Sequence, residues 1–199
     1  MSLMKLKELV RKNRSCRRFK EHERIPPRLL RELVDLARFA PSAGNLQPLK
    51  YVLSVGPETN QRIFECLGWA AYLEDWPGPS PGQRPAGYII ILGDKSVSDR
   101  IDCDHGLAAQ TILLGAVERG LAGCVIGSIK REPLAEILSI PDDFRILLAL
   151  ALGAPDETRK TVVLGEDRDI RYRRDSKGAH LVPKRGLSEI ILAEYGPSD

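Results

Sequence analysis

The segment NRSCRRF, Asn13–Phe19, gathers side chains that are well suited to holding an anion. Arg14, Arg17 and Arg18 each carry a planar guanidinium that can donate paired, charge-assisted hydrogen bonds to a phosphate, and Ser15 adds a hydroxyl. The alternative is a charged loop between two helices, because most surface charges are simply solvated. These residue types leave both interpretations open.

A second basic group, VPKRG, lies far along the chain at Val182–Gly186 and offers Lys184 and Arg185 beside a glycine. Taken alone, this group is more typical of a solvated tail than of a binding site. It gains meaning only if the fold brings it to the first basic segment.

The stretch APSAGNLQPLKY, residues 40–51, is rich in short hydrogen-bonding groups. Ser42, Asn45 and Gln47 can bond the amide and carbonyl edges of a ligand, and the glycine among them allows close backbone approach. Pro41 pushes the preceding residue out of the helical region, so the stretch is equally typical of a helix stop followed by a turn. It predicts either one wall of a polar ligand site or an ordinary loop.

Several catalytic classes lack their motifs in this sequence. There is no Gly-x-Gly-x-x-Gly after a strand, no Walker-type Gly-Lys-Ser/Thr and no Gly-x-Ser-x-Gly elbow. The cysteines form no Cys-x-x-Cys pair and the histidines show no metal-ligand spacing, so we expect no metal site. We interpret Asp102, Asp104 and His105 as ordinary capping of a helix N-terminus.

Composition indicates a single globular domain with a substantial core, since 43% of the 199 residues are hydrophobic. The formal charge of +3 demands no polyanionic partner, and the basic clusters lack the interleaved aromatic residues of a nucleic-acid binder. No apolar run reaches signal-peptide or membrane-spanning length. With cysteines that fit reduced thiols, these features predict a soluble cytoplasmic protein.

Hydrophobic periodicity predicts alternating helices and strands in a layered α/β or α+β fold. The runs at 88–93 and 144–153 are apolar throughout, as in strands buried on both faces. The longest expected helix, 102–120, is apolar nearly all round, which places it at the centre of the fold or at a subunit interface. The other expected elements are helices at 3–12, 27–40, 61–71 and 131–140, strands at 50–55 and 123–129, and a Pro/Gly-rich loop at 75–87.

Residues 157–199 differ from the rest of the chain. They are charged and show little periodicity up to Gly186, and LSEIIL at 187–192 is their one strongly apolar run. A segment of this kind cannot form its own core. We therefore expect it to wrap across the body or onto a partner subunit.

Five segments, in this order, resemble the nitroreductase family of FMN-dependent oxidoreductases over nearly the whole chain: NRSCRRF, ARFAPSAGNLQPLKYVL, GLAAQTILLGAVERGLAGCVIGSI, FRILLALALGAP and VPKRGLSEII. The resemblance implies one domain over residues 1–199 with an α+β fold, whose central, mostly antiparallel sheet is packed between helices. It also implies an intertwined homodimer with two FMN molecules at the interface, in which residues 157–199 form an extended arm.

The resemblance carries site residues onto this sequence. The family often has Arg-Arg-Ser where this chain has Asn13-Arg14-Ser15, so one phosphate cation is missing or is supplied by Arg18. Phosphate and ribityl contacts fall on Arg14, Ser15, Arg17, Lys184 and Arg185. Flavin-lining positions fall on Pro41, Ser42, Ala43, Asn45 and Gln47, typically from the other subunit, and on Ile126 and Gly127 beside the isoalloxazine ring.

The chemistry that the resemblance implies is a ping-pong reaction. NADH or NADPH passes a hydride to flavin N5 and leaves, and a nitroaromatic, quinone or similar acceptor is then reduced by two electrons. Arg17 is the candidate cation at the flavin N1–O2 edge, and no side-chain acid or base is required. The segment 69–84 is the candidate lid, whose Trp69, Tyr72 and Trp76 either stack on a planar acceptor or pack an interface.

Other functions remain open at this stage. The same fold could serve reductive dehalogenation or oxygen-dependent flavin fragmentation. A flavin- or nucleotide-binding module without turnover, or a weak nucleic-acid binder that uses the two basic clusters, belongs to a different class.

Overall fold

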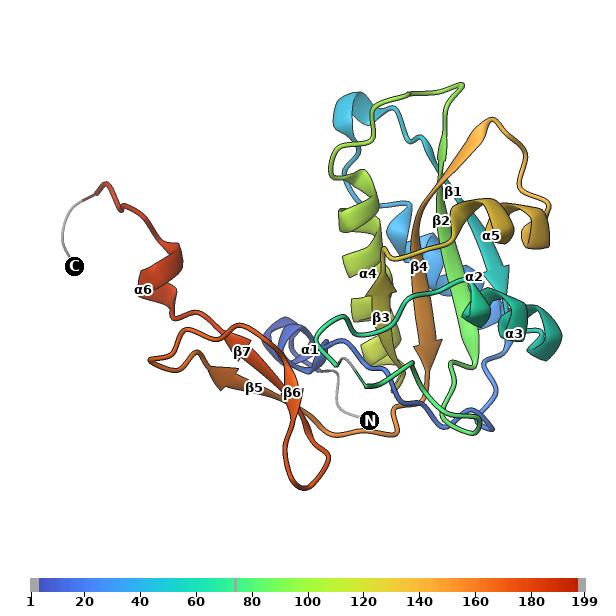
Figure 1. Cartoon of the computed structure of the whole chain (residues 1–199). Coiled ribbons are helices and arrows are strands. Elements are labelled where there is room, and N and C mark those ends of the chain that lie inside the picture. Colours follow the sequence, from blue (N-terminus) through green and yellow to red (C-terminus); the bar gives the residue numbers. More distant parts are fainter. Residues whose placement is uncertain (1–3, 74, 197–199) are drawn as a thin grey trace.

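The computed structural model of the chain describes residues 4–73 and 75–196. Its centre is a four-stranded antiparallel sheet with the strand order β1-β2-β4-β3 (Figure 1). The strands are β1 Leu49–Ser54, β2 Gly87–Asp94, β3 Ala122–Ile126 and β4 Phe144–Gly153. The predicted α+β fold with a central antiparallel sheet is confirmed.

Strand β2 explains why helices cover both faces of this sheet. Ile89 and Ile91 belong to the core on one face, while Tyr88, Ile90 and Leu92 belong to the core on the other. None of these five side chains is more than 4% exposed, as a strand buried on both faces requires. The first face is covered by α2 Pro27–Ala37 and α4 Asp104–Glu118, and the second by α3 Pro57–Glu65 and α5 Arg131–Leu138 (Figure 1).

Most predicted elements lie within a few residues of their expected ends, but the helix expected at 61–71 was wrong in its bounds. Helix α3 begins at Pro57, where the missing N–H of a proline is harmless, and ends at Glu65. Beyond it, Leu67 pairs with Ile129 in an isolated antiparallel bridge, and this extended pairing stops the helix. The first helix, α1, spans Leu6–Lys12, and the part of the prediction at residue 3 lies outside the described residues.

The arm, defined as residues 157–196, contains a small sheet that the sequence did not predict. We call the described residues before it the body. Strands β5 Arg159–Val163 and β7 His180–Lys184 pair in parallel, and β6 Arg173–Arg174 pairs antiparallel to β7. A short helix, α6 Leu187–Ile190, follows and reaches away from the body (Figure 1). The large apolar residues of α6 and just beyond it face solvent in the single chain: Leu187 is 69%, Ile190 64% and Leu192 102% exposed.

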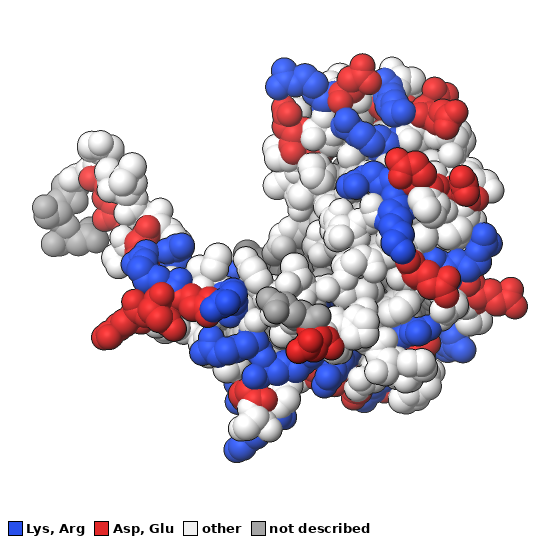
Figure 2. Space-filling model, viewed as in Figure 1, with Lys and Arg blue, Asp and Glu red and all other residues white. Residues whose placement is uncertain are grey.

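Charge is distributed unevenly over the molecule. Figure 2 shows charged side chains along the arm and over the outer parts of the body, whereas the body surface beside the hollow between body and arm is largely uncharged. Within residues 4–73 and 75–196, no helix is both long enough and apolar enough to span a bilayer.

Candidate functional site

The segment 13–19 is held by buried residues three positions apart. Asn13, Cys16 and Phe19 are at most 8% exposed. The backbone amide of Cys16 donates to the Gly123 carbonyl at 2.9 Å, and that of Phe19 donates to the Gln83 carbonyl at 3.0 Å. These contacts fix the segment against the edge of the sheet, so the arginines between the anchors start from defined backbone positions.

Asn13 stands at the position where the family that the sequence resembles often has an arginine. In this chain the residue serves packing. It is buried, and its amide donates to Gln110 Oε1 on α4 at 3.4 Å. Arg18, the suggested substitute, lines a separate polar surface pocket with Asp156 and Lys177. Neither residue therefore adds a cation beside Arg14.

Arg159 does add one, and sequence reasoning missed it. Its Nη1 donates to the Arg14 carbonyl at 3.4 Å, while Arg14 Nη2 donates to the Val10 carbonyl at 2.7 Å. Within the described part of the chain, the buried Nε atoms of Arg14 and Arg159 have no hydrogen-bond acceptor. In the sequence, Arg159 was one charge among many in an unpatterned tail, and only the β5–β7 pairing brings it to Arg14.

Burial disfavours the reactive thiolate form of the two thiols near this segment. Burial raises the pKa of Cys16 to about 12 and also raises the pKa of Cys124, whose thiol is hydrogen bonded to the Ser15 side chain. All four cysteines are free. Because the thiolate is the reactive form, the raised pKa values argue against cysteine nucleophilic chemistry at the two buried sites.

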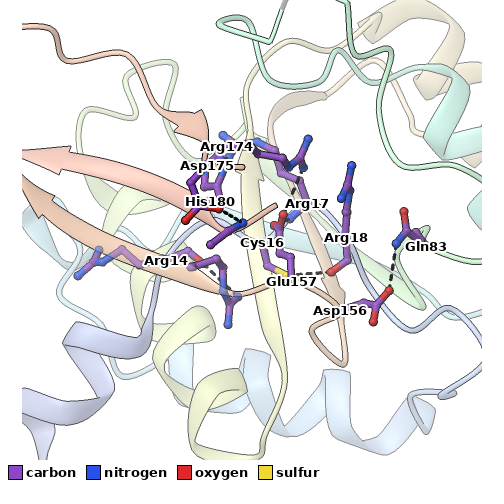
Figure 3. A network of polar contacts seen from close by, with 12 residues as sticks. Arg14, Cys16, Arg17, Arg18, Gln83, Asp156, Glu157, Arg174, Asp175 and His180 are labelled. Atoms are coloured by element: carbon purple, nitrogen blue, oxygen red, sulfur yellow. Dashed lines mark hydrogen bonds and ion pairs between the residues drawn. The ribbon is translucent and has the colours of Figure 1, made fainter. Parts of the chain in front are cut away.

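Arg17 lies at the centre of a polar network that joins body to arm (Figure 3). Its Nη1 is 3.2 Å from His180 Nε2, its guanidinium carbon lies 4.6 Å from the centroid of the Tyr172 ring, and its backbone amide donates to Glu157 Oε1 at 2.6 Å. Glu157 also pairs with Arg174 at 3.2 Å. We call these five residues the Arg17 cluster.

The β6–β7 hairpin is built to deliver its members to this cluster. Asp175 accepts hydrogen bonds from the amides of Lys177 and Ala179, and Gly178 adopts a left-handed φ of +77° that favours glycine. This tight turn places Arg174 opposite His180 in the strand register. Both side chains are thereby directed to one place.

The candidate lid meets the arm through aromatic contacts. The rings of Tyr72 and Tyr172 lie 5.1 Å apart, and the Arg174 guanidinium lies 4.6 Å from the Trp76 ring. Trp69 behaves differently, since it packs on Phe64 at 5.5 Å and belongs to the hydrophobic core. Of the three aromatic residues, Trp69 therefore packs within the subunit, whereas Tyr72 remains 47% exposed.

The loop after α2 is organised by Asp104, which the sequence analysis interpreted as a helix cap. Asp104 is 4% exposed, accepts a hydrogen bond from Ser42 Oγ at 2.5 Å and another from the Ala43 amide at 3.2 Å. Ser42 Oγ in turn accepts from the Gln47 amide at 2.9 Å. A pocket of about 170 Å³ opens beside this loop, lined by Pro41, Ser42, Gln47, Tyr51 and Asp104 among others.

The predicted site residues lie in three places within one chain. Arg14, Ser15 and Arg17 lie at the arm junction. The lid begins next to Ile126 and Gly127, because the Gly68 amide donates to the Ser128 carbonyl at 2.8 Å.

The other predicted residues lie elsewhere. The loop residues Pro41, Ser42, Ala43, Asn45 and Gln47 lie at the N-terminal end of α4. Lys184 and Arg185 lie at the far end of β7, roughly 13 Å of strand beyond His180.

Comparison with known proteins matches this arrangement to one family. The profile of the nitroreductase family matches residues 10–154, which include the anchored segment, the loop after α2 and the lid. A Methanothermobacter thermautotrophicus protein named "Putative NADH dehydrogenase/NAD(P)H nitroreductase" is 28% identical over 171 residues, covering 81% of this chain and 83% of that protein. A 4-nitrobenzoate reductase of Pseudomonas putida is 26% identical over 179 residues, covering 67% of this chain and 78% of that one.

Solved structures agree on the fold. A nitroreductase family protein of Clostridium difficile 630 superposes with a TM-score of 0.67 at 22% identity, covering 96% of this chain and 99% of that one. An FMN-dependent nitroreductase of Clostridium difficile R20291 gives a TM-score of 0.64 at 22% identity, over 76% and 88% of the two chains. The chain belongs to the nitroreductase family.

Proposed function

We propose that this protein is an FMN-dependent oxidoreductase that takes electrons from NAD(P)H and passes them in a ping-pong cycle to an organic acceptor such as a nitroaromatic or a quinone. The observation that carries the proposal is the family match over residues 10–154, which spans the anchored arginine segment and the lid. Relatives named 4-nitrobenzoate reductase and NADPH-flavin oxidoreductase support the choice of donor and acceptor.

The residues present fit the phosphate end of such a cofactor. Arg14 and Arg159 are adjacent cations whose Nε atoms lack acceptors among the described residues, and Ser15 is exposed beside them. Guanidinium groups match phosphate oxygens in geometry and charge. We assign Arg14, Ser15 and Arg159 to the phosphate and ribityl chain.

At the ring end, bound FMN would supply two-electron chemistry, because its ring can take up a hydride and hand it on. The chain's task is to hold charge and exclude water. Arg17 would place a fixed cation beside the N1–O2 edge, and Ile126 and Gly127 would flank the ring. Tyr72 and Trp76, tied to the arm by Tyr172 and Arg174, would cover the open face, where a planar acceptor can stack.

A homodimer completes this site in our proposal. Pro41, Ser42, Ala43, Asn45 and Gln47 lie at the N-terminal end of α4, whereas the anchored segment meets α4 at its middle, through Asn13 and Gln110. A second copy would therefore present these loop residues to the flavin. Lys184 and Arg185 would likewise act across the interface. The solvent-exposed apolar residues of α6 and the uncharged exposed residues Leu107 and Gln110 of α4 support association. The free cysteines support a cytoplasmic location.

The test is spectroscopic. Purified protein incubated with excess FMN and desalted should retain one yellow, protein-bound flavin per chain, and anaerobic NADH or NADPH should bleach it. Adding a nitroaromatic or a quinone should restore the colour. Retention without bleaching would indicate a flavin-binding protein without turnover, and the absence of retained flavin would refute the proposal.

The same preparation separates the competing chemistries. A single turnover is analysed with and without oxygen. Loss of halide from a haloaromatic would identify a dehalogenase, and breakdown of the flavin in oxygen would identify a fragmenting enzyme.

A further inference from the structure

We propose that His180, assisted by Tyr172, is a positioning residue that fixes the direction of the Arg17 guanidinium and thereby tunes the flavin. The proposal rests on the proposed function, in which Arg17 serves the N1–O2 edge of FMN. His180 and Tyr172 lie outside residues 10–154, so the family match assigns neither of them a role.

The contact between Arg17 and His180 is chemically directional. Arg17 Nη1 lies 3.2 Å from His180 Nε2, and the imidazole is 1% exposed. A guanidinium can only donate hydrogen bonds, so Nε2 must accept and the ring proton must reside on Nδ1. His180 can therefore hold Arg17 only while its own imidazole is neutral. Protonation of Nε2 would remove the acceptor and break the contact.

Tyr172 restricts the guanidinium in a second direction. The guanidinium carbon lies 4.6 Å from the Tyr172 centroid, and the Tyr172 and His180 rings lie 5.2 Å apart. Arg17 is thus held by an acceptor at Nη1 and by an aromatic ring beside it. The hydrogen bonds of Arg17 use its Nη1, which contacts His180, and its backbone amide, which donates to Glu157. Within the described part of the chain, Nη2 has no acceptor, so this atom can donate to a ligand.

The surroundings keep His180 neutral. Burial and the neighbouring Arg17 lower the pKa of His180 to about 4. The charged groups that face it from the packed elements are Arg17 of the anchored segment, Glu157 before β5, Arg159 of β5 and Arg174 of β6. Three of these four are cations, so the acceptor at Nε2 persists throughout the neutral range.

Flavin potential provides the direct test of positioning. His180→Leu removes the acceptor, whereas His180→Gln keeps an acceptor at a similar reach, and His22→Gln is the control at an exposed histidine. In His180→Leu, we expect reduced FMN to lose about tenfold in binding relative to oxidised FMN, which is a midpoint shift of about 30 mV to more negative values. His180→Gln and His22→Gln should stay near the wild-type potential. If His180→Leu does not fold, His180→Asn replaces it, since its amide is too short to reach Nη1.

A flavin-free measurement tests the contact itself. In NMR titrations of the apo protein, one of the three histidines should titrate well below pH 6. This signal should vanish in His180→Gln and should move toward ordinary histidine values in Arg17→Met. An unshifted His180 in Arg17→Met would overturn the proposal.

The two proposals fail in distinguishable ways. A wild-type protein that binds no FMN overturns both. Full FMN binding with a wild-type potential in His180→Leu overturns the positioning role alone.

Discussion

Ser42 and Asp104 are joined by a 2.5 Å hydrogen bond that ties the loop after α2 to the first turn of α4. The Ser42 hydroxyl also accepts from the Gln47 amide at 2.9 Å, so its proton and a lone pair are both used inside the subunit. The Ser42 side chain therefore shapes the loop, and its hydroxyl is already engaged within the subunit.

Replacing Asp104 should loosen this loop. Asp104→Ala removes the acceptor of the half-buried Ser42 hydroxyl and of the exposed Ala43 amide. Because water can replace part of what is lost, we expect a loss of about 1 kcal/mol of stability for each hydrogen bond. FMN affinity, measured by quenching of flavin fluorescence, should fall about tenfold, while Asp102→Asn on the exposed neighbouring position should change neither quantity. Unchanged affinity in Asp104→Ala would show that the loop does not contact the flavin.

The Glu157–Arg174 pair should matter far more than surface pairs. The Glu157 side chain is 2% exposed and accepts from both Arg174 and the Arg17 amide. Glu157→Ala leaves a buried cation uncompensated, and we expect a loss of about 3–5 kcal/mol in urea denaturation. The matched control is Glu23→Ala at the half-exposed Lys20–Glu23 pair, which should lose less than about 1 kcal/mol. Equal losses in the two variants would contradict the assigned burial.

Substitutions at Trp69 and Tyr72 should have different effects, the first on stability and the second on acceptor binding. Trp69 packs on Phe64 and against Gly78, so Trp69→Ala should destabilise the protein by about 3 kcal/mol. Tyr72 is 47% exposed, so Tyr72→Ala should leave the melting temperature nearly unchanged and should raise the KM for a planar acceptor severalfold. If Tyr72→Ala alters stability and not KM, the lid residue is structural.

The pattern of these residues shows what the sequence could and could not predict. The apolar run of β2 predicted that the strand is buried on both faces, because isoleucine side chains pack equally well into the core on either side of the sheet. Asp104 looked like a cap, since a sequence does not reveal that an acid at a helix start bonds a loop 62 residues earlier in the chain. Arg159 and His180 belong to strands with too few apolar residues for periodicity to detect, and their roles depend on long-range pairing.

The stability of the folded protein should fall at acidic pH because of His180. Its pKa is lowered to about 4 in the folded protein, against 6.5 for a free histidine, because burial and Arg17 disfavour the imidazolium. The unfolded chain therefore binds this proton first, so the folded state loses stability as the pH falls from about 6.5 toward 4, and this contribution levels off below that. His180→Gln should flatten the change when urea midpoints are compared between pH 7 and pH 4. Parallel profiles in the two proteins would mean that His180 titrates normally.

Removal of α6 should test the dimer and the site together. A chain ending at Gly186 lacks Leu187, Ile190 and Leu192, whose exposure in the single chain leaves an apolar surface without a cover. Light scattering should report twice the 22.1 kDa chain mass for the full protein and a smaller mass for the shortened one. Because the proposed flavin site draws on the loop after α2 of the other copy, FMN affinity should fall with the loss of the dimer. A control chain ending at Gly196 should retain both properties. A shortened chain that remains dimeric and binds FMN fully would exclude α6 from the interface.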